Sequence, residues 1–139
     1  MQVDFFAADV TAPRVNKSKT TSWIKAVSRK YNAKIASLSF VFCSDSYLLD
    51  INTRFLKHST LTDIITFPLS EKGEPIEAEI YISLERVAEN AKLFKATATE
   101  ELHRVLIHGV LHLCGFKDKT KRQKALMRKT EDACLSLRK

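Results

Sequence analysis

The segment TATEELHRVLIHGVLHLCG, residues 97–115, constrains the fold most, because it predicts a long helix with both ends marked. Thr97 or Thr99 can cap the first turn, since a threonine hydroxyl accepts a hydrogen bond from a free backbone N–H. Gly115 is typical of the left-handed residue that ends a helix. The sequence therefore predicts a helix over 97–115 and a sharp change of chain direction at Gly115.

The other elements follow from the spacing of apolar residues. Leu38, Phe40 and Phe42 alternate along the chain, as on one face of a strand, while Trp23 and Val27 recur at helical spacing. Strands are expected at 3–10, 35–44, 62–69 and 78–83, and further helices at 20–32, 45–56, 83–94 and 119–137. The sequence predicts an α+β fold, in which a small mixed sheet of about four strands packs with about five helices.

Several side chains are expected in the core. Trp23, Phe40 and Phe42 could be imagined as a base-stacking platform, but their periodicity favours packing. The apolar run 62–69 ends near Pro68 and is expected to be buried on both faces. The residues expected to face the core from the later helices are Leu84, Val87, Ala91, Phe94, Ala125, Leu126, Ala133 and Leu137.

Length and composition predict an ordinary globular protein. The chain has 139 residues, 45% hydrophobic and 28% charged, and we expect one domain spanning residues 1–139. The start has no signal-peptide pattern, and no segment reaches the ~18 apolar residues of a membrane helix. Cys43, Cys114 and Cys134 are irregularly spaced, so no disulfide framework is expected. We therefore expect a cytoplasmic protein with no membrane partner.

Positive charge is concentrated at the end of the chain. The formal net charge is +7, and residues 117–139 hold nine basic side chains against three acidic ones. Such a segment fits a polyanionic partner such as nucleic acid. It equally fits a solvated helix with a lysine-rich face, and charge alone leaves both interpretations open.

The motif HGVLHLCGFKD, residues 108–118, predicts a metal site. His108 and His112 lie four residues apart, on one face of the expected helix, so both imidazoles can reach the same ion. The turn at Gly115 can bring Asp118 back towards them. Two nitrogens and one oxygen with a fourth position open are typical of catalytic zinc. The plainer alternative is an amphipathic helix with one histidine packed and the other in water.

Other potential ligands fit less well. His103 lies five residues before His108, about 140° round the helix, and cannot join the pair. Cys114 points away from His112 and is expected in the core. His58 falls in an expected loop, where spacing does not place it.

The same motif resembles the HGxLHLxGYDH signature of the YbeY family, bacterial metal-dependent endoribonucleases of ribosomal RNA maturation. The resemblance continues in IN at 51–52 and TDIITFP at 62–68, similar to the family's LN…TDVLSFP. AEIYIS at 78–83 takes the place of its GDIxIS, and LMRKTED at 126–132 resembles the helix after the motif. These matches cover nearly the whole chain in the family's order.

The resemblance implies a single-strand-specific endoribonuclease of ribosomal RNA precursors, working with the small ribosomal subunit. It implies that His108, His112 and Asp118 hold one catalytic metal ion, expected to be zinc. The family's third ligand is usually histidine, whereas here it is Asp118. The family's arginine falls at Leu56. Candidates for holding the RNA phosphates are Arg54, Lys57, Lys117, Lys119, Lys121 and Arg122.

Three alternatives are weighed against a nuclease. Zinc metallopeptidases carry a glutamate directly after the first histidine as general base, and here that position is Gly109. Non-haem iron oxygenases use two histidines and a carboxylate, usually on double-sheet scaffolds. A ribosome-associated assembly factor with a structural metal and little nuclease activity stays open, since the family's arginine is missing.

The run KHSTLTD, residues 57–63, is a smaller cluster of polar side chains. The resemblance would place Thr62 and Asp63 at the rim of a substrate cleft, together with His58, Ser59 and Thr60. Such residues more often cap turns and satisfy backbone groups, and we favour that interpretation.

Overall fold

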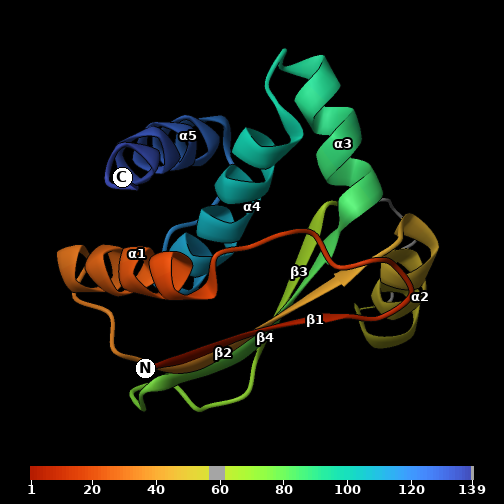
Figure 1. Cartoon of the computed structure of the whole chain (residues 1–139). Helices are drawn as coiled ribbons and strands as arrows, with labels where there is room; N and C mark the ends of the chain where they lie inside the picture. Colours follow the sequence, from red (N-terminus) through yellow and green to blue (C-terminus); the bar gives the residue numbers. More distant parts are fainter. Residues whose placement is uncertain (57–61, 139) are drawn as a thin grey trace.

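The computed structural model describes residues 1–56 and 62–138, with the side chain of residue 56 left out. Its elements are β1 (Gln2–Ala7), α1 (Lys17–Lys30), β2 (Ile35–Cys43), α2 (Asp45–Leu56), β3 (Ile64–Pro68), β4 (Ile76–Ser83), α3 (Leu84–Leu93), α4 (Ala98–Leu113) and α5 (Lys121–Ser136). The predicted α+β class is confirmed, with a mixed four-stranded sheet and five helices in the described residues (Figure 1).

The sheet has the strand order β1-β2-β4-β3. β1, β2 and β4 run parallel, and β3 pairs antiparallel with β4 at the edge. Phe5 pairs with Phe40, and Phe40 pairs with Ile80, so these apolar side chains form a row across one face. That row supports the helices that carry the candidate site.

α4 packs on this face of the sheet and contributes the largest group of buried side chains. The buried apolar residues of α4 are Leu102, Val105, Leu106, Ile107, Val110 and Leu111. Gly109 lies at a close contact between α4 and the sheet. A Cβ added there would lie 2.9 Å from Ile64 Cδ1 and 3.2 Å from Ile80 Cγ2. The missing side chain therefore lets α4 settle directly on β3 and β4.

β3 separates two layers of packing. Ile64 reaches α4, whereas Ile65 packs with Leu48 and Ile51 of α2. Successive side chains of a strand point to opposite faces, so α4 and α2 lie on opposite faces of the sheet. The prediction that β3 is fully buried on both faces is wrong, because β3 is an edge strand and Ile65 is its only buried residue.

Both predicted ends of α4 are confirmed. Thr97 is the N-cap and forms a capping box with Glu100. After the helix, Gly115 has a φ of +105°. Its N–H donates to His112 O, and the N–H of Phe116 donates to Leu111 O, each at 3.0 Å. These two bonds are the Schellman arrangement, which reverses the chain directly after His112.

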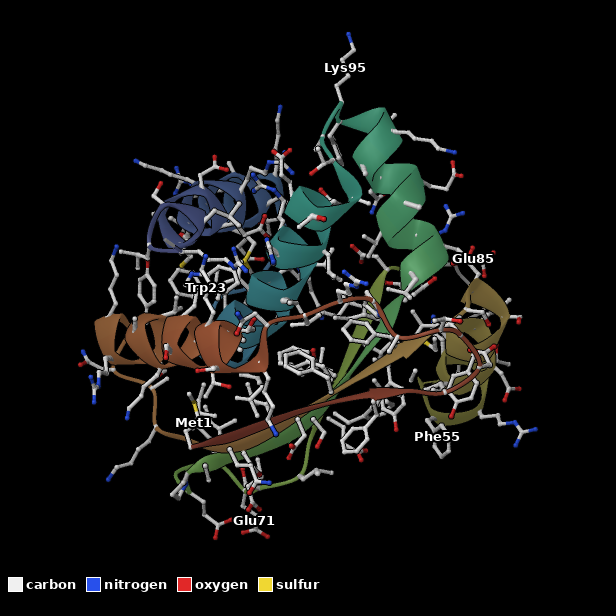
Figure 2. All side chains as sticks on the ribbon, viewed as in Figure 1. Met1, Trp23, Phe55, Glu71, Glu85 and Lys95 are labelled. Carbon is white, nitrogen blue, oxygen red and sulfur yellow. The ribbon has the colours of Figure 1, made fainter. Side chains whose placement is uncertain are left out.

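Trp23 joins α1 to α5 in the core. It is 3% exposed, and its Nε1–H donates to Cys134 O at 2.7 Å (Figure 2). Phe40 and Phe42 are also buried, so the core assignment of the three aromatic residues is confirmed. α1 itself begins earlier than predicted, at Lys17, because Asn16 rather than a threonine or serine caps it.

The predicted packing faces of the later helices are partly wrong. Val87 and Ala91 are buried, but Phe94 is 51% exposed. The side chains that α5 buries are Met127, Thr130, Glu131 and Cys134, whereas Ala125, Leu126 and Leu137 are exposed and Ala133 is half-buried. The prediction followed hydrophobicity, but the inner face of α5, which packs onto α4, includes the polar Thr130 and Glu131 beside Met127 and Cys134.

None of the helices in the described residues is both long enough and apolar enough to cross a membrane.

Candidate metal centre

The structure brings His108, His112 and Asp118 together. His108 Nε2 lies 3.3 Å from Asp118 Oδ2, and His112 Nε2 lies 3.3 Å from Asp118 Oδ1. One ligand atom from each residue lies within 4.8 Å of the others. Both imidazoles are partly exposed, His108 at 20% and His112 at 34%, and both face the same carboxylate. The alternative of one packed and one solvated histidine therefore does not describe this helix.

The turn after α4 positions the carboxylate. The Schellman bonds reverse the chain at Gly115, and Phe116 then packs edge-on against Tyr31 with ring centroids 5.1 Å apart. This turn carries the chain back, so that Asp118 lies against His108 and His112 of α4. The role foreseen for Gly115 is confirmed.

Glu131 is the residue of the site that sequence reasoning missed. His108 Nδ1 lies 2.6 Å from Glu131 Oε2, a hydrogen bond that a proton on Nδ1 donates. Arg104 holds the other Glu131 oxygen at 3.0 Å and contacts Asp132 at 2.6 Å. A carboxylate on the far nitrogen of a ligand histidine fixes the ring and leaves the near nitrogen free for a metal.

A signal for Glu131 exists in the sequence. Met127, Glu131 and Cys134 recur at the spacing of one helical face, and the glutamate interrupts that face. A buried acid on a helix needs a partner, which indicates a site residue or a buried cation.

Acidic groups determine the electrostatics around His108. Burial alone lowers the pKa of His108, but the hydrogen bond and charge of Glu131, with the charges of Asp63 and Asp118, raise it above its ordinary value. Burial raises the pKa of Asp63 against the opposing charge of His108. The groups thus favour positive charge at this point, which a proton or a metal cation can supply.

The three side chains line a cleft of about 790 Å³. Its other lining residues are Asn52, Thr62, Asp63, Ile64, Ile65, Thr66, Pro68, Leu113 and Lys119. The Thr62 hydroxyl donates to Ile64 O at 3.2 Å, as expected for a turn residue. Asp63 uses its backbone oxygen to accept from Ser83 N, while its side chain lines the cleft. Asp63 therefore lines the cleft, as the resemblance suggests, although the turn interpretation is favoured from the sequence.

The proposed phosphate-binding residues are distributed unevenly. Lys119 lines the cleft, and Lys117, Lys121 and Arg122 are exposed nearby in sequence without lining it. Arg54 does not line the cleft, and its exposed side chain pairs with Asp50 at 3.1 Å. Lys57, His58, Ser59 and Thr60 lie outside the described residues.

His103 and Cys114 are not part of the candidate metal centre. His103 packs edge-on against Trp23, with ring centroids 6.1 Å apart. Burial, with the charges of Arg138 and Lys19, lowers the pKa of His103 to about 4. Cys114 is half-buried against the core. Both exclusions agree with the helical geometry predicted from the sequence.

Comparison with known proteins gives a consistent result. The sequence model of the family described as Endoribonuclease YbeY matches residues 6–138. The Endoribonuclease YbeY of Cytophaga hutchinsonii is 47% identical over 135 residues, covering 97% of this chain and 94% of that protein. That of Flavobacterium psychrophilum is 49% identical over 116 residues, covering 84% and 82%.

A solved structure shares the fold. The solution structure of TM1509 from Thermotoga maritima has a TM-score of 0.61 and 25% sequence identity. It covers 96% of this chain and 89% of that protein. Sequence and fold agree over the same residues that build the centre, and the chain belongs to the YbeY family.

Proposed function

We propose that this chain is a metal-dependent endoribonuclease that cleaves single-stranded regions of ribosomal RNA precursors in the cytoplasm, in contact with the small ribosomal subunit. One observation carries the proposal. Two imidazoles and one carboxylate converge within 4.8 Å in an open cleft. The family's relatives bear the name endoribonuclease, which agrees with this arrangement.

The donor set fits one zinc ion held by His108, His112 and Asp118. Zinc accepts imidazole nitrogen and carboxylate oxygen, and catalytic sites have three protein ligands with one position left for solvent. Glu131 occupies His108 Nδ1, so Nε2 is the nitrogen that faces the other donors. At such a site a divalent cation supplies Lewis-acid polarisation of a phosphoryl oxygen and activation of water.

Two other cleft residues are proposed to bind the RNA phosphate and to accept a proton during cleavage. Lys119 lies at the cleft, where its ammonium group can hold a phosphate. Asp63 lines the same cleft as the three candidate metal ligands without being one of them, and burial raises the pKa of its carboxyl group. We assign Asp63 the role of accepting the proton of the attacking hydroxyl on its carboxylate oxygen.

The peptidase alternative lacks the glutamate that zinc metallopeptidases carry directly after the first histidine, and it lacks the space for one. The position directly after the first histidine is Gly109, and a Cβ there would already lie 2.9 Å from Ile64 Cδ1. A glutamate does not fit between α4 and the sheet. The position that these peptidases use for their base is therefore closed here, and the arrangement supports phosphoryl chemistry, in which a bound cation would polarise a phosphoryl oxygen.

The test compares substrates and a matched pair of carboxylate variants. Zinc-loaded protein is assayed on single-stranded RNA, on the same RNA annealed to its complement, and on a casein substrate. Cleavage of the single strand alone, lost in Asp118→Asn and retained in Asp50→Asn, is the expected result. Asp50 is the control because it is 59% exposed and does not line the cleft.

The assembly-factor alternative predicts a different outcome. If zinc is structural, Asp118→Asn would lower the thermal stability of the loaded protein, and parent and variant would both leave the RNA intact. Intact RNA with every protein would therefore contradict the nuclease proposal.

A further inference from the structure

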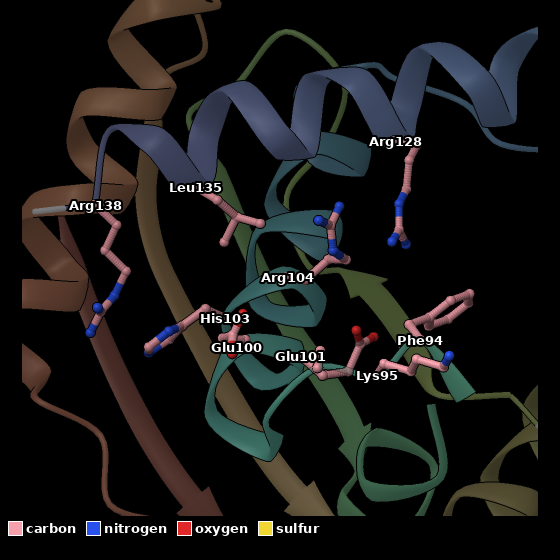
Figure 3. A pocket seen from close by; sticks show the side chains of 10 residues that line it. Phe94, Lys95, Glu100, Glu101, His103, Arg104, Arg128, Leu135 and Arg138 are labelled. Carbon is pink, nitrogen blue, oxygen red and sulfur yellow. The ribbon is translucent and has the colours of Figure 1, made fainter. Parts of the chain in front are cut away.

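Two cavities continue from the metal centre along α4 towards its start. The first, which we name the lateral cavity, has a volume of about 480 Å³ and shares Asp63, His108 and Asp118 with the cleft. The second, the outer pocket, has about 440 Å³ (Figure 3). The residues common to both cavities are Phe94, Glu101, Arg104 and Arg128. An RNA strand bound across His108, His112 and Asp118 can therefore continue into these two cavities.

Phe94 and Arg128 offer planar groups at this junction. The Phe94 ring is 51% exposed, although it is a large apolar side chain. The Arg128 guanidinium lies 4.9 Å from the centre of that ring. Aromatic rings and guanidinium planes are the groups on which proteins stack unpaired nucleobases. The exposed ring thus has a chemical use that core packing does not provide.

Glu101 is an acceptor directed into the same space. It lies seven residues before His108 on α4, hence on the same helical face and about 10 Å away along the axis. It is 5% exposed, and its carboxylate points towards the space between Arg104, Arg128 and Phe94 (Figure 3). Among the described residues, no hydrogen-bond donor and no ion pair reaches this carboxylate at contact distance.

Arg104 does not neutralise Glu101 by direct contact. Its guanidinium is held by Glu131 at 3.0 Å and by Asp132 at 2.6 Å. Burial raises the pKa of Glu101, and the charges of Arg104 and Arg128 oppose that rise. The Glu101 side chain is nearly buried and lines both cavities, so a ligand in them could donate N–H groups to its carboxylate oxygens.

We infer that the lateral cavity and the outer pocket form a guanine-binding subsite, in which Phe94 and Arg128 stack the base and the Glu101 carboxylate accepts hydrogen bonds from its N1–H and N2–H groups. The inference rests on the proposed function, because it makes RNA the ligand. This subsite would add a base preference to a cleft whose other proposed contacts are with the RNA phosphates.

The choice of guanine follows from matching donors to acceptors. A carboxylate presents two acceptor oxygens side by side, and the Watson–Crick edge of guanine presents two adjacent N–H donors. On adenine and cytosine, the exocyclic amino group lies next to a ring nitrogen that is an acceptor. Uracil has one N–H between two carbonyl oxygens. A phosphate in the same place would face Glu101 with like charge.

The test measures base preference by direct binding. The full chain is titrated with guanosine 5′-monophosphate and with adenosine 5′-monophosphate, followed by nuclear magnetic resonance. The shared ribose phosphate makes any difference depend on the base. We expect the guanine nucleotide to bind at least about fivefold tighter, and we expect Glu101→Gln to remove the preference.

A second variant guards against a folding artefact at the buried Glu101. Phe94→Leu removes the exposed ring and should weaken the binding of both nucleotides. Leu93→Ala is the matched control, since Leu93 is 73% exposed and lines neither cavity. Circular dichroism verifies the fold of each protein.

The outcomes separate this inference from the nuclease proposal. A guanine preference that Glu101→Gln abolishes supports the subsite, even if no RNA is cleaved. Equal binding of the two nucleotides, or a preference that survives Glu101→Gln, overturns the subsite, even if RNA is cleaved.

Discussion

At the scale of the residue, the candidate metal centre depends on side chains other than its three candidate donors. Burial lowers the pKa of His108, but the hydrogen bond and the charge of Glu131 raise it again. Glu131 in turn is fixed by Arg104, which is 17% exposed. Side chains of α4 and α5 thus surround the candidate centre, whereas its three candidate donors come from α4 and the turn after it.

This layered arrangement predicts the effect of one substitution. Glu131→Gln should weaken zinc binding by about 10-fold to 100-fold, because the amide no longer holds the Nδ1 proton of His108 as a charged acceptor does. A competition titration with a chromophoric chelator measures the affinity. Glu89→Gln, at an acid that is 54% exposed, is the control. Equal zinc affinity in Glu131→Gln and the parent would remove Glu131 from the metal centre.

At the scale of the element, α4 was the easiest part of the fold to predict and α5 the hardest. The ends of α4 are determined locally, by Thr97 and by the turn at Gly115, so spacing alone located the histidine pair. The inner face of α5 depends on a partner 27 residues earlier, since Glu131 is buried against Arg104. No local pattern contains that contact.

Strand order was equally beyond the local pattern. The run at β3 is apolar enough for a central strand, but its pairing with β4 alone leaves it at the edge. The polar run before this strand favours a turn for Asp63, whereas in the assembled fold Asp63 lines the cleft. Residue spacing predicts which side chains share a helix face, but only the assembled sheet decides which loops meet.

The contact between α4 and the sheet can be tested through Gly109. Gly109→Ala should lower the free energy of unfolding by about 1–2 kcal/mol, because the strain of the added methyl outweighs the gain in helix propensity. The close neighbours are Ile64 Cδ1 at 2.9 Å and Ile80 Cγ2 at 3.2 Å. Urea unfolding gives the value. An increase in stability would show that α4 does not need a glycine at this contact.

At the scale of the whole molecule, acid stability should depend on His103. Its folded-state pKa of about 4 lies below the ordinary value of 6.5, so the unfolded chain binds more protons between these two pH values. Stability then rises with pH across that window, and the contribution is lost as the pH falls from 6.5 towards 4.

His103→Gln should flatten this part of the stability curve. The measurement is urea unfolding at intervals from pH 4 to pH 7, comparing the slope of the variant with that of the parent. His108 has a raised pKa and contributes in the opposite direction, so the difference between the two proteins isolates His103. Identical slopes would contradict the burial of a neutral imidazole against Trp23.

The central claim is that the three donors of α4 and its following turn hold a metal on which RNA cleavage depends. The most direct test titrates chelator-treated protein with zinc while measuring bound metal and cleavage of a single-stranded RNA in the same samples. The account predicts that cleavage rises with zinc up to one equivalent per chain. It predicts a loss of about 100-fold or more in His112→Ala, with the fold retained. Cleavage that persists without metal, or is unchanged in His112→Ala, would contradict it.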